Sequence, residues 1–243
     1  MEILFVRHGQ PAWIVDDNPE LDPTLTELGR EQAELVGARI AARGATEIVT
    51  SPARRARETA APLARAIGVT PQVVDDLVEL RLPDWSGLTP QQYIEKFREA
   101  RKRNPHEWWD GLPGGEAFTA FSQRVRAAVD SLLEARGIRR LKAHAVSENP
   151  DCPACVARAE HQPLFDVRHD ARERIVVFGH GGTNTVAMTV LLGVACVPWE
   201  WERFTLSHAG ILRLKAIPLG PGYIFSLRAF NDCEHIPKAK RSV

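Results

Sequence analysis

The sequence lacks the features that would place it in several functional classes. Its 31 Lys and Arg residues equal its 31 Asp and Glu residues, so the formal net charge is zero. Nothing therefore supports a broad basic surface for nucleic acid or for membranes. The longest apolar stretch, Val186–Val197, is too short to cross a bilayer and is typical of a buried helix. Only four cysteines occur, and because no signal-peptide pattern precedes the first predicted strand, we expect a cytoplasmic protein with reduced thiols.

The remaining composition, 44% hydrophobic and 26% charged residues, is that of an ordinary globular protein. Strand patterns alternate with helix patterns, which favours helices packed on a sheet. We therefore predict a single domain over residues 1–243, with an α/β fold: a three-layer α/β/α sandwich with a largely parallel central sheet. The predicted strands are Ile3–Val6, Glu47–Thr50, Arg174–Phe178, Phe204–Leu206, Ile211–Ile217 and Ile224–Phe230. The predicted helices begin at about Leu25, Ser51, Pro90, Glu116 and Gly182.

One long and mostly polar stretch, at about 138–173, interrupts this alternation and predicts an inserted loop or lid. It contains Cys152-Pro153-Ala154-Cys155, a spacing that could supply two thiolate ligands to zinc. The histidines available to complete such a site are His144, His161 and His169. Because one Cys-x-x-Cys is only half of a zinc site, an unliganded loop remains the alternative.

The strongest chemical signal lies where predicted strands end. Ile3–Val6 is followed by Arg7-His8-Gly9, and Arg174–Phe178 is followed by Gly179-His180-Gly181-Gly182. Open α/β sheets bind ligands at the carboxyl ends of their strands, and a buried cation or imidazole needs a partner there. If the two strands are neighbours, both imidazoles project into one crevice. His180 also stands at a helix amino terminus, whose free N–H groups favour an anion.

The segment 51–60, Ser-Pro-Ala-Arg-Arg-Ala-Arg-Glu-Thr-Ala, adds a third piece. A hydroxyl followed by a proline is typical of a helix start, which places an arginine in the first turn. Two arginines, two histidines and a helix terminus around one pocket together indicate a phosphate site.

These motifs, in this order, resemble the histidine phosphatase superfamily, the phosphoglycerate-mutase-like proteins. The resemblance covers most of the chain outside the stretch at 138–173. It rests on Arg7-His8-Gly9, Leu25-Thr26-Glu27-Leu28-Gly29, Ser51-Pro52 with Arg55-Ala56 and Thr59-Ala60, Leu77-Val78-Glu79 followed by Asp84-Trp85-Ser86-Gly87, Pro113-Gly114-Gly115-Glu116, and His180-Gly181-Gly182.

The resemblance implies a phosphoglycerate-mutase-like fold and a catalytic set of His8, Glu79 and His180. His8 would be the nucleophile that becomes phosphohistidine, and Glu79 would be the general acid. An ion pair with an arginine is the structural alternative for Glu79. The implied phosphate-binding residues are Arg7, Arg55, His180 and Gly181. We expect no cofactor and no metal in this site. The Pro-Gly-Gly-Glu segment is a family marker without an assigned role.

Four positions depart from the family pattern. Ile14 stands where the family's mutases commonly carry asparagine, and an apolar side chain cannot hydrogen-bond a phosphate. Pro11 and Ala117 replace small hydroxyl residues, and Pro83 replaces a glycine. These departures favour a phosphatase that hydrolyses a small phosphomonoester through a phosphohistidine on His8.

Two alternatives remain, a cofactor-dependent phosphoglycerate-type mutase and a noncatalytic phosphate-binding sensor. We expect a small phosphorylated substrate as the partner, with no nucleic acid and no membrane, and leave a homodimer open.

Overall fold

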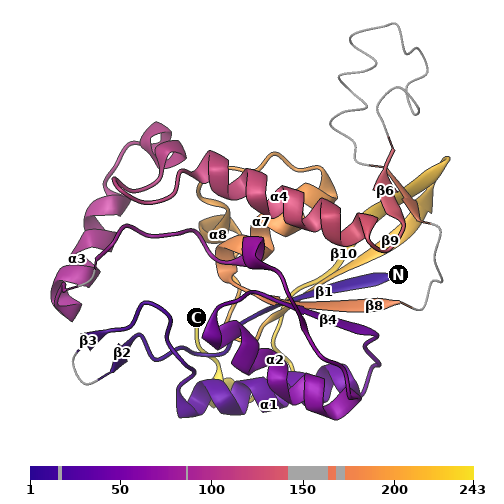
Figure 1. Ribbon diagram of the computed structural model, residues 1–243, viewed down its shortest axis with the longest axis horizontal. Helices are drawn as coiled ribbons and strands as arrows, with labels where there is room; N and C mark the ends of the chain where they lie inside the picture. Colours follow the sequence, from indigo (N-terminus) through magenta and orange to yellow (C-terminus); the bar gives the residue numbers. More distant parts are fainter. Residues whose placement is uncertain (16–17, 86, 142–163, 168–172) are drawn as a thin grey trace, which may run out of the picture.

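The computed structural model describes residues 1–15, 18–85, 87–141, 164–167 and 173–243 (Figure 1). Its main sheet has eight strands in the order β5-β4-β8-β1-β9-β10-β7-β6. These strands are β1 (Glu2–Arg7), β4 (Glu47–Thr50), β5 (Gln72–Val73), β6 (Ile138–Arg140), β7 (Phe165–Val167), β8 (Arg174–Gly179), β9 (Ile211–Leu219) and β10 (Gly222–Asp232). A separate short ribbon pairs β2 (Ile14–Val15) with β3 (Asn18–Pro19).

Helices cover both faces of this sheet (Figure 1). They are α1 (Glu27–Ala41), α2 (Arg54–Ile67), α3 (Pro90–Arg101), α4 (Phe118–Glu134), α7 (Gly181–Leu192) and α8 (Glu200–Arg203), with 3-10 turns η1 (Asp75–Leu77), η2 (Pro105–Asp110) and η3 (Lys238–Lys240). Among the described residues, none of these helices combines the length and apolar character needed to span a membrane.

Alternation along β1 explains the layers. Ile3 and Phe5 pack into the core on the α4 and α7 side, whereas Leu4 and Val6 pack into the core on the α1 and α2 side. Successive side chains of a strand point to opposite faces, so an uninterrupted apolar run such as Ile3–Val6 fits a strand buried on both faces. The α/β fold with helices on both faces of a central sheet is therefore as predicted.

The prediction of a largely parallel sheet is wrong. Strands β5, β4, β8 and β1 run parallel to one another, whereas β9, β10, β7 and β6 each run antiparallel to their neighbours. Parallel neighbours need a long crossover such as α1 or α2. Only Gly220-Pro221 separates β9 from β10, and so short a connection can join only antiparallel strands.

Three local predictions also need correction. The segment Phe204–Leu206 forms no strand and leads from α8 towards β9. Helix α2 begins at Arg54 rather than Ser51, and its first N–H donates to the Asp22 carboxylate at 3.0 Å instead of to a capping hydroxyl. The predicted insert at 138–173 is not all loop, since β6 and β7 pair at the edge of the sheet.

The zinc hypothesis falls in the part of this stretch that is not described. Residues 142–163 and 168–172 lie outside the described residues, and they include every ligand proposed for zinc: Cys152, Cys155, His144, His161 and His169. The hypothesis stays a prediction.

Candidate active site

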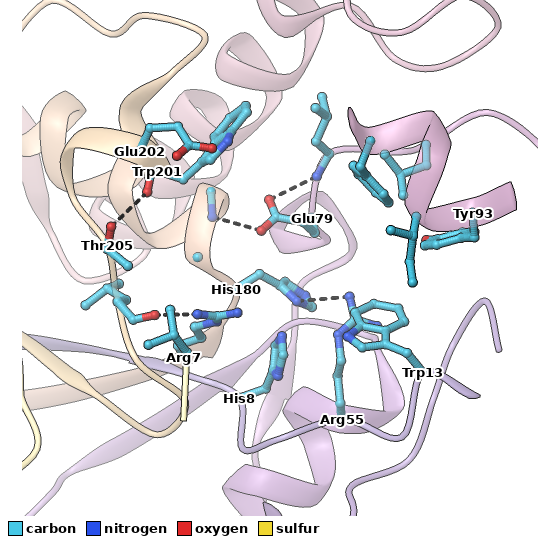
Figure 2. Close-up of a pocket in the computed structure, with 18 of the residues that line it drawn as sticks. Arg7, His8, Trp13, Arg55, Glu79, Tyr93, His180, Trp201, Glu202 and Thr205 are labelled. Carbon is cyan, nitrogen blue, oxygen red and sulfur yellow. Dashed lines mark hydrogen bonds between the residues drawn. The ribbon is translucent and has the colours of Figure 1, made fainter. Parts of the chain in front are cut away.

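The site forms where three parallel strands end side by side. Strand β8 lies between β4 and β1, and Arg7 at the end of β1 pairs in register with Gly179 at the end of β8. The carboxyl ends of these strands therefore deliver His8 and His180 to one edge of the sheet. Their ring centroids lie 5.3 Å apart (Figure 2). The expectation of two neighbouring imidazoles in one crevice is confirmed.

His8 is buried and held by its own chain. Its Nδ1 lies 2.8 Å from the carbonyl oxygen of Gly9. Because a carbonyl can only accept, Nδ1 carries the proton and the lone pair is on Nε2. Burial lowers the pKa of His8 well below its ordinary value of 6.5, and His180, Arg55 and Arg7 lower it further. The ring is therefore neutral, with one nitrogen free for nucleophilic attack.

A hydrogen bond and a close backbone approach hold the loop at Gly9, which follows His8. The N–H of Gly9 donates to the Thr59 hydroxyl at 2.9 Å, and that hydroxyl donates to the Arg55 carbonyl at 2.6 Å. A Cβ on Gly9 would lie 2.5 Å from the carbonyl oxygen of Gly29. The loop therefore needs glycine because backbone from another segment lies directly against it.

His180 uses both of its ring nitrogens. Arg55 Nη2 lies 3.1 Å from Nδ1, and because a guanidinium only donates, Nδ1 must accept. Nε2 then carries the proton and donates to the Ser51 hydroxyl at 2.8 Å. Burial lowers the pKa of His180 well below its ordinary value, with Arg55, Arg7 and Arg124 adding to the effect. Ser51, which the sequence predicts as a helix cap, is a hydrogen-bond partner of His180 in the structure.

Arg7 and Arg55 face the same cavity from opposite sides (Figure 2). Arg7 donates from Nη1 to the Leu206 carbonyl, and Arg55 forms an ion pair with Asp22 at 3.5 Å. The indole of Trp13 lies against Arg55, with 5.0 Å between the guanidinium carbon and the ring centroid. Within the described part of the chain, the buried Nε atoms of both arginines have no hydrogen-bond acceptor. Buried cationic donors without acceptors favour binding of an anion.

Glu79 sits on the amino terminus of α7. Its carboxylate accepts from the N–H of Gly182 at 2.8 Å, from the N–H of Thr183 at 3.1 Å and from the N–H of Leu80 at 3.0 Å. A Cβ on Gly182 would lie 2.6 Å from a carboxylate oxygen of Glu79, so any other residue there would displace that side chain. Among the described residues no arginine forms an ion pair with Glu79, whose partners are instead these backbone donors and the Thr183 hydroxyl.

The ion pair between Arg124 and Glu116 supports the segment that carries Glu79. Glu116, in the Pro-Gly-Gly-Glu segment, therefore has a structural role. Arg124 donates to the carbonyl oxygens of Val78 at 2.8 Å and Glu79 at 3.0 Å. The same guanidinium makes two bonds of 2.7 Å to the Glu116 carboxylate. Burial alone would raise the pKa of Glu116, but hydrogen bonds from Arg124 and Arg81 hold it below its ordinary value. The pair therefore positions the chain that presents Glu79.

Removal of Arg124 is expected to destabilise the protein by about 3 kcal/mol, because the poorly exposed Glu116 carboxylate would lose its two short bonds to that guanidinium and keep, among the described residues, only its contacts with Arg81. Urea unfolding of Arg124→Ala, Glu116→Ala and the double variant measures this coupling. The double variant should be more stable than the sum of the two single losses implies. Strictly additive losses would show that the pair does not act as a unit.

Sequence reasoning missed a third histidine. His208 lies between α8 and β9, with its ring centroid 5.6 Å from that of His8. Its Nδ1 lies 2.9 Å from the Ser242 hydroxyl, and the N–H of Ala209 donates to the His8 carbonyl at 3.2 Å. Burial lowers the pKa of His208 to about 3, and Arg7 contributes. The sequence gives no signal for His208, because it does not stand in a His-Gly motif directly after a predicted strand, as His8 and His180 do.

We expect the free energy of unfolding to decrease as the pH falls from 7 to 5. The folded protein holds His8, His180 and His208 neutral, whereas in the unfolded chain they bind protons with a pKa near 6.5. Because the folded pKa values are depressed, the stabilisation is complete above about pH 6.5 and is lost as the pH falls towards them. Within that window, each such histidine lowers the free energy of unfolding by about 1.4 kcal/mol for every unit by which the pH falls. Urea unfolding at several pH values measures the slope.

The matched controls for this slope are His208→Asn and His106→Asn. The first removes one buried histidine and should flatten the slope, whereas His106 is exposed on η2 and its loss should leave the slope unchanged. A free energy of unfolding that stays constant between pH 7 and pH 5 would contradict the assignment of three neutral imidazoles.

These side chains share one cavity of about 770 Å³. Its inner end is lined by all six residues that the sequence analysis assigned to the site: Arg7, His8, Arg55, Glu79, His180 and Gly181. Its outer part is lined mainly by aromatic and aliphatic side chains from the segment around β2, from α3 and from the α8 region. No group of three or more His, Cys, Asp or Glu side chains among the described residues could hold a metal ion.

Comparison with known protein families gives one broad match. The profile of the histidine phosphatase superfamily (branch 1) matches residues 3–164. A curated protein named probable phosphoglycerate mutase GpmB, from Yersinia enterocolitica, is 32% identical over 143 residues, which are 55% of this chain and 64% of that protein. A bifunctional protein of Mycobacterium tuberculosis is 34% identical over 134 residues, 54% of this chain and 37% of its own. The matches therefore span less than two thirds of these relatives.

Solved structures match over a larger share of the chain. A structure described as mycobacterial hydrolase 2 has a TM-score of 0.66 at 25% identity, covering 95% of this chain and 90% of its own. A mycobacterial glucosyl-3-phosphoglycerate phosphatase in complex with inorganic phosphate has a TM-score of 0.66 at 24% identity, covering 97% and 99%. The alpha-ribazole phosphatase of Shigella flexneri has a TM-score of 0.64 at 18% identity, covering 96% of both chains. At these identities the last two show similarity of fold.

Proposed function

Because the chain belongs to the histidine phosphatase superfamily, we propose that it is a cytoplasmic phosphatase that hydrolyses a small phosphomonoester through a phosphohistidine on His8. One observation carries the proposal: His8 is locked with Nδ1–H on the Gly9 carbonyl, so that Nε2 is free beside two arginines whose Nε atoms have no acceptor among the described residues. A neutral nucleophile, fixed cations and a carboxyl group at one cavity are what in-line phosphoryl transfer requires.

In the first step, His8 Nε2 attacks phosphorus as the bond to the leaving oxygen breaks. The electron pair of that bond goes to the oxygen, which takes a proton from Glu79. Arg7 and Arg55 stabilise the charge on the equatorial oxygens, because the fold already holds both guanidinium groups at the cavity and little solvent has to rearrange. The products of this step are the alcohol and phosphohistidine.

In the second step, water attacks phosphorus and gives its proton to the Glu79 carboxylate. The bond between phosphorus and Nε2 breaks, its electron pair returns to nitrogen, and inorganic phosphate leaves. The Gly9 carbonyl keeps the proton on Nδ1 through both steps. His8 therefore ends in the tautomer in which it started.

The Ser51 hydroxyl allows His180 to adopt a second neutral tautomer. A hydroxyl donates as readily as it accepts, so the Ser51 hydroxyl can reverse its bond to Nε2 when Arg55 turns from His180 towards the phosphate. For this, the ring loses its Nε2 proton and gains one on Nδ1 by exchange with solvent, so that it stays neutral and Nδ1 donates to a phosphoryl oxygen. In this way a neutral His180 binds phosphate despite its depressed pKa.

The relative named as a probable phosphoglycerate mutase makes a mutase the second candidate. A mutase acting on phosphoglycerate must also hold a carboxylate. Among the described residues that line the cavity, Arg101 is the one cation besides Arg7 and Arg55, and Glu202 pairs with it at 2.8 Å. That pairing favours the phosphatase.

The test is an assay of both reactions on one preparation. We expect inorganic phosphate to be released from p-nitrophenyl phosphate, and an acid-labile phosphoenzyme to accumulate after rapid quenching. Isomerisation of 3-phosphoglycerate without phosphate release would establish the mutase instead. Tight binding of inorganic phosphate with neither reaction would leave the noncatalytic sensor.

A further inference from the structure

The cavity extends well beyond the phosphate-binding end, and its outer part is apolar. Six apolar or aromatic side chains line this part: Trp13, Ile14, Tyr93, Ile94, Phe97 and Trp201. They come from the β2 segment, from α3 and from α8, so three distant parts of the sequence build one wall. Figure 2 shows Trp13 beside Arg55, with Tyr93 on the same side of the cavity and Trp201 across from it.

Helix α3 supplies an aromatic wall without belonging to the core. None of its residues is buried, and Ile94 and Phe97 are 50% and 38% exposed. The rings of Trp85, Tyr93 and Phe97 nevertheless contact one another edge to face, with centroids 5.2–5.3 Å apart. Such contacts fix ring orientation. An exposed apolar patch on an ordered wall indicates a binding surface.

The segment around β2 repeats the pattern. Trp13 and Ile14 are 41% and 50% exposed and line the same space. Trp13 also lies on the Arg55 guanidinium at 5.0 Å. A ligand held by Arg55 through its phosphoryl group therefore extends between Trp13 and α3.

Charge in the outer part of the cavity is already neutralised. Arg101 and Glu202 pair at 2.8 Å, so a second acidic group on a substrate would meet no unpaired cation among the described lining residues. A polyhydroxyl group would place hydroxyls against apolar rings, which costs free energy for each hydrogen bond that water had supplied. An uncharged apolar group has no such hydrogen bonds with water to lose when it enters the outer part of the cavity.

We propose, resting on the phosphatase function above, that the substrate is the phosphate monoester of an alcohol bearing an uncharged aromatic group. The phosphoryl group lies between Arg7 and Arg55, and the aromatic group lies between Trp13 and the α3 wall of Tyr93, Ile94 and Phe97. A cavity of about 770 Å³ is within the ordinary size range of pockets for small organic ligands.

The first experiment compares phosphate esters of primary alcohols, so that leaving-group strength is similar: 3-phenylpropyl phosphate, sn-glycerol 3-phosphate and 3-phosphoglycerate. We expect kcat/KM for the phenylpropyl ester to be about tenfold or more above the other two. Equal or higher values for glycerol 3-phosphate or 3-phosphoglycerate would overturn the substrate class while leaving the phosphatase intact.

A binding measurement separates this inference from the proposed function. The probes are two compounds that cannot be hydrolysed, 3-phenylpropylphosphonate and 3-carboxypropylphosphonate, with Kd measured by calorimetry. The phenyl compound should bind about tenfold or more tightly even if the protein releases no phosphate from any ester. Similar Kd values, or tighter binding of the carboxylate, would refute the aromatic site whatever the outcome of the activity assays.

Phe97→Ser is the matched variant, with Leu219→Ser as its control. Leu219 is 53% exposed at the end of β9 and does not line the cavity. Phe97→Ser should reduce the preference for the phenylpropyl ester over glycerol 3-phosphate by about tenfold, through a higher KM, whereas Leu219→Ser should keep that preference. An equal loss on both esters in Phe97→Ser would assign Phe97 to the fold and count against the proposal.

Discussion

Replacement of His8 by alanine is expected to lower phosphate release by about 10⁴-fold or more. The variant has no nitrogen to form the phosphoenzyme, and none of its neighbours can substitute. Arg55 holds Nδ1 of His180, whose Nε2 is bound to Ser51. His208 packs against the side of the His8 ring at 5.6 Å. Initial rates, and labelling of the protein after an alkaline quench that preserves phosphohistidine, measure the loss.

The control for this prediction is His106→Ala, which removes an exposed imidazole on η2 and should retain both turnover and labelling. Circular dichroism and a urea midpoint verify that His8→Ala is folded. Folding is expected, because the Thr59 hydroxyl and the Gly29 backbone that hold the loop are unaffected. Near-normal turnover in folded His8→Ala would remove His8 as the nucleophile.

The second large effect is expected for Glu79→Gln. An amide cannot supply the proton that an alkoxide needs, so hydrolysis of an alkyl phosphate should slow by about 10²–10⁴-fold. Nitrophenolate leaves without protonation, so the loss on p-nitrophenyl phosphate should be much smaller in the phosphorylation step. Rapid-quench measurement of phosphoenzyme formation with both esters isolates that step from the later attack of water.

Glu116→Gln provides a carboxylate-to-amide control close to the same segment. It changes the pair with Arg124 and does not line the cavity, so it should affect both esters by the same factor. If Glu79→Gln also slowed both esters equally, Glu79 would hold the amino terminus of α7 in place rather than donate a proton.

Most of the site could be predicted, because short local motifs identify its residues. Arg7-His8-Gly9 and His180-Gly181-Gly182 follow apolar runs that can only be buried strands, and polar residues there fall at the ligand-binding end of the sheet. The pairing of β1 with β8, with Arg7 opposite Gly179, then brings the two histidines together. The assignment of Glu79 came from the family resemblance, since nothing in its local sequence shows that it would reach the α7 terminus.

Side chains that contact the site from distant positions in the sequence could not be predicted. Ser51 precedes a proline and has the local sequence of a helix cap, yet its hydroxyl bonds to His180, 129 residues away in the sequence. His208 contacts His8 only because β9 lies beside β1. Periodicity and capping rules report on neighbours a few residues apart, and they carry no information about such contacts.

Over most of the chain, local sequence is enough to predict which segments are strands or helices and which polar side chains stand at strand ends. Those properties follow from local spacing of apolar residues and from short motifs. Three features follow only from the folded chain: the antiparallel half of the sheet, the neutral tautomers of His8 and His180, and the aromatic wall of the cavity. Each of these depends on which distant segments pack together, because hydrogen-bond partners and burial are set by neighbours in space rather than in sequence.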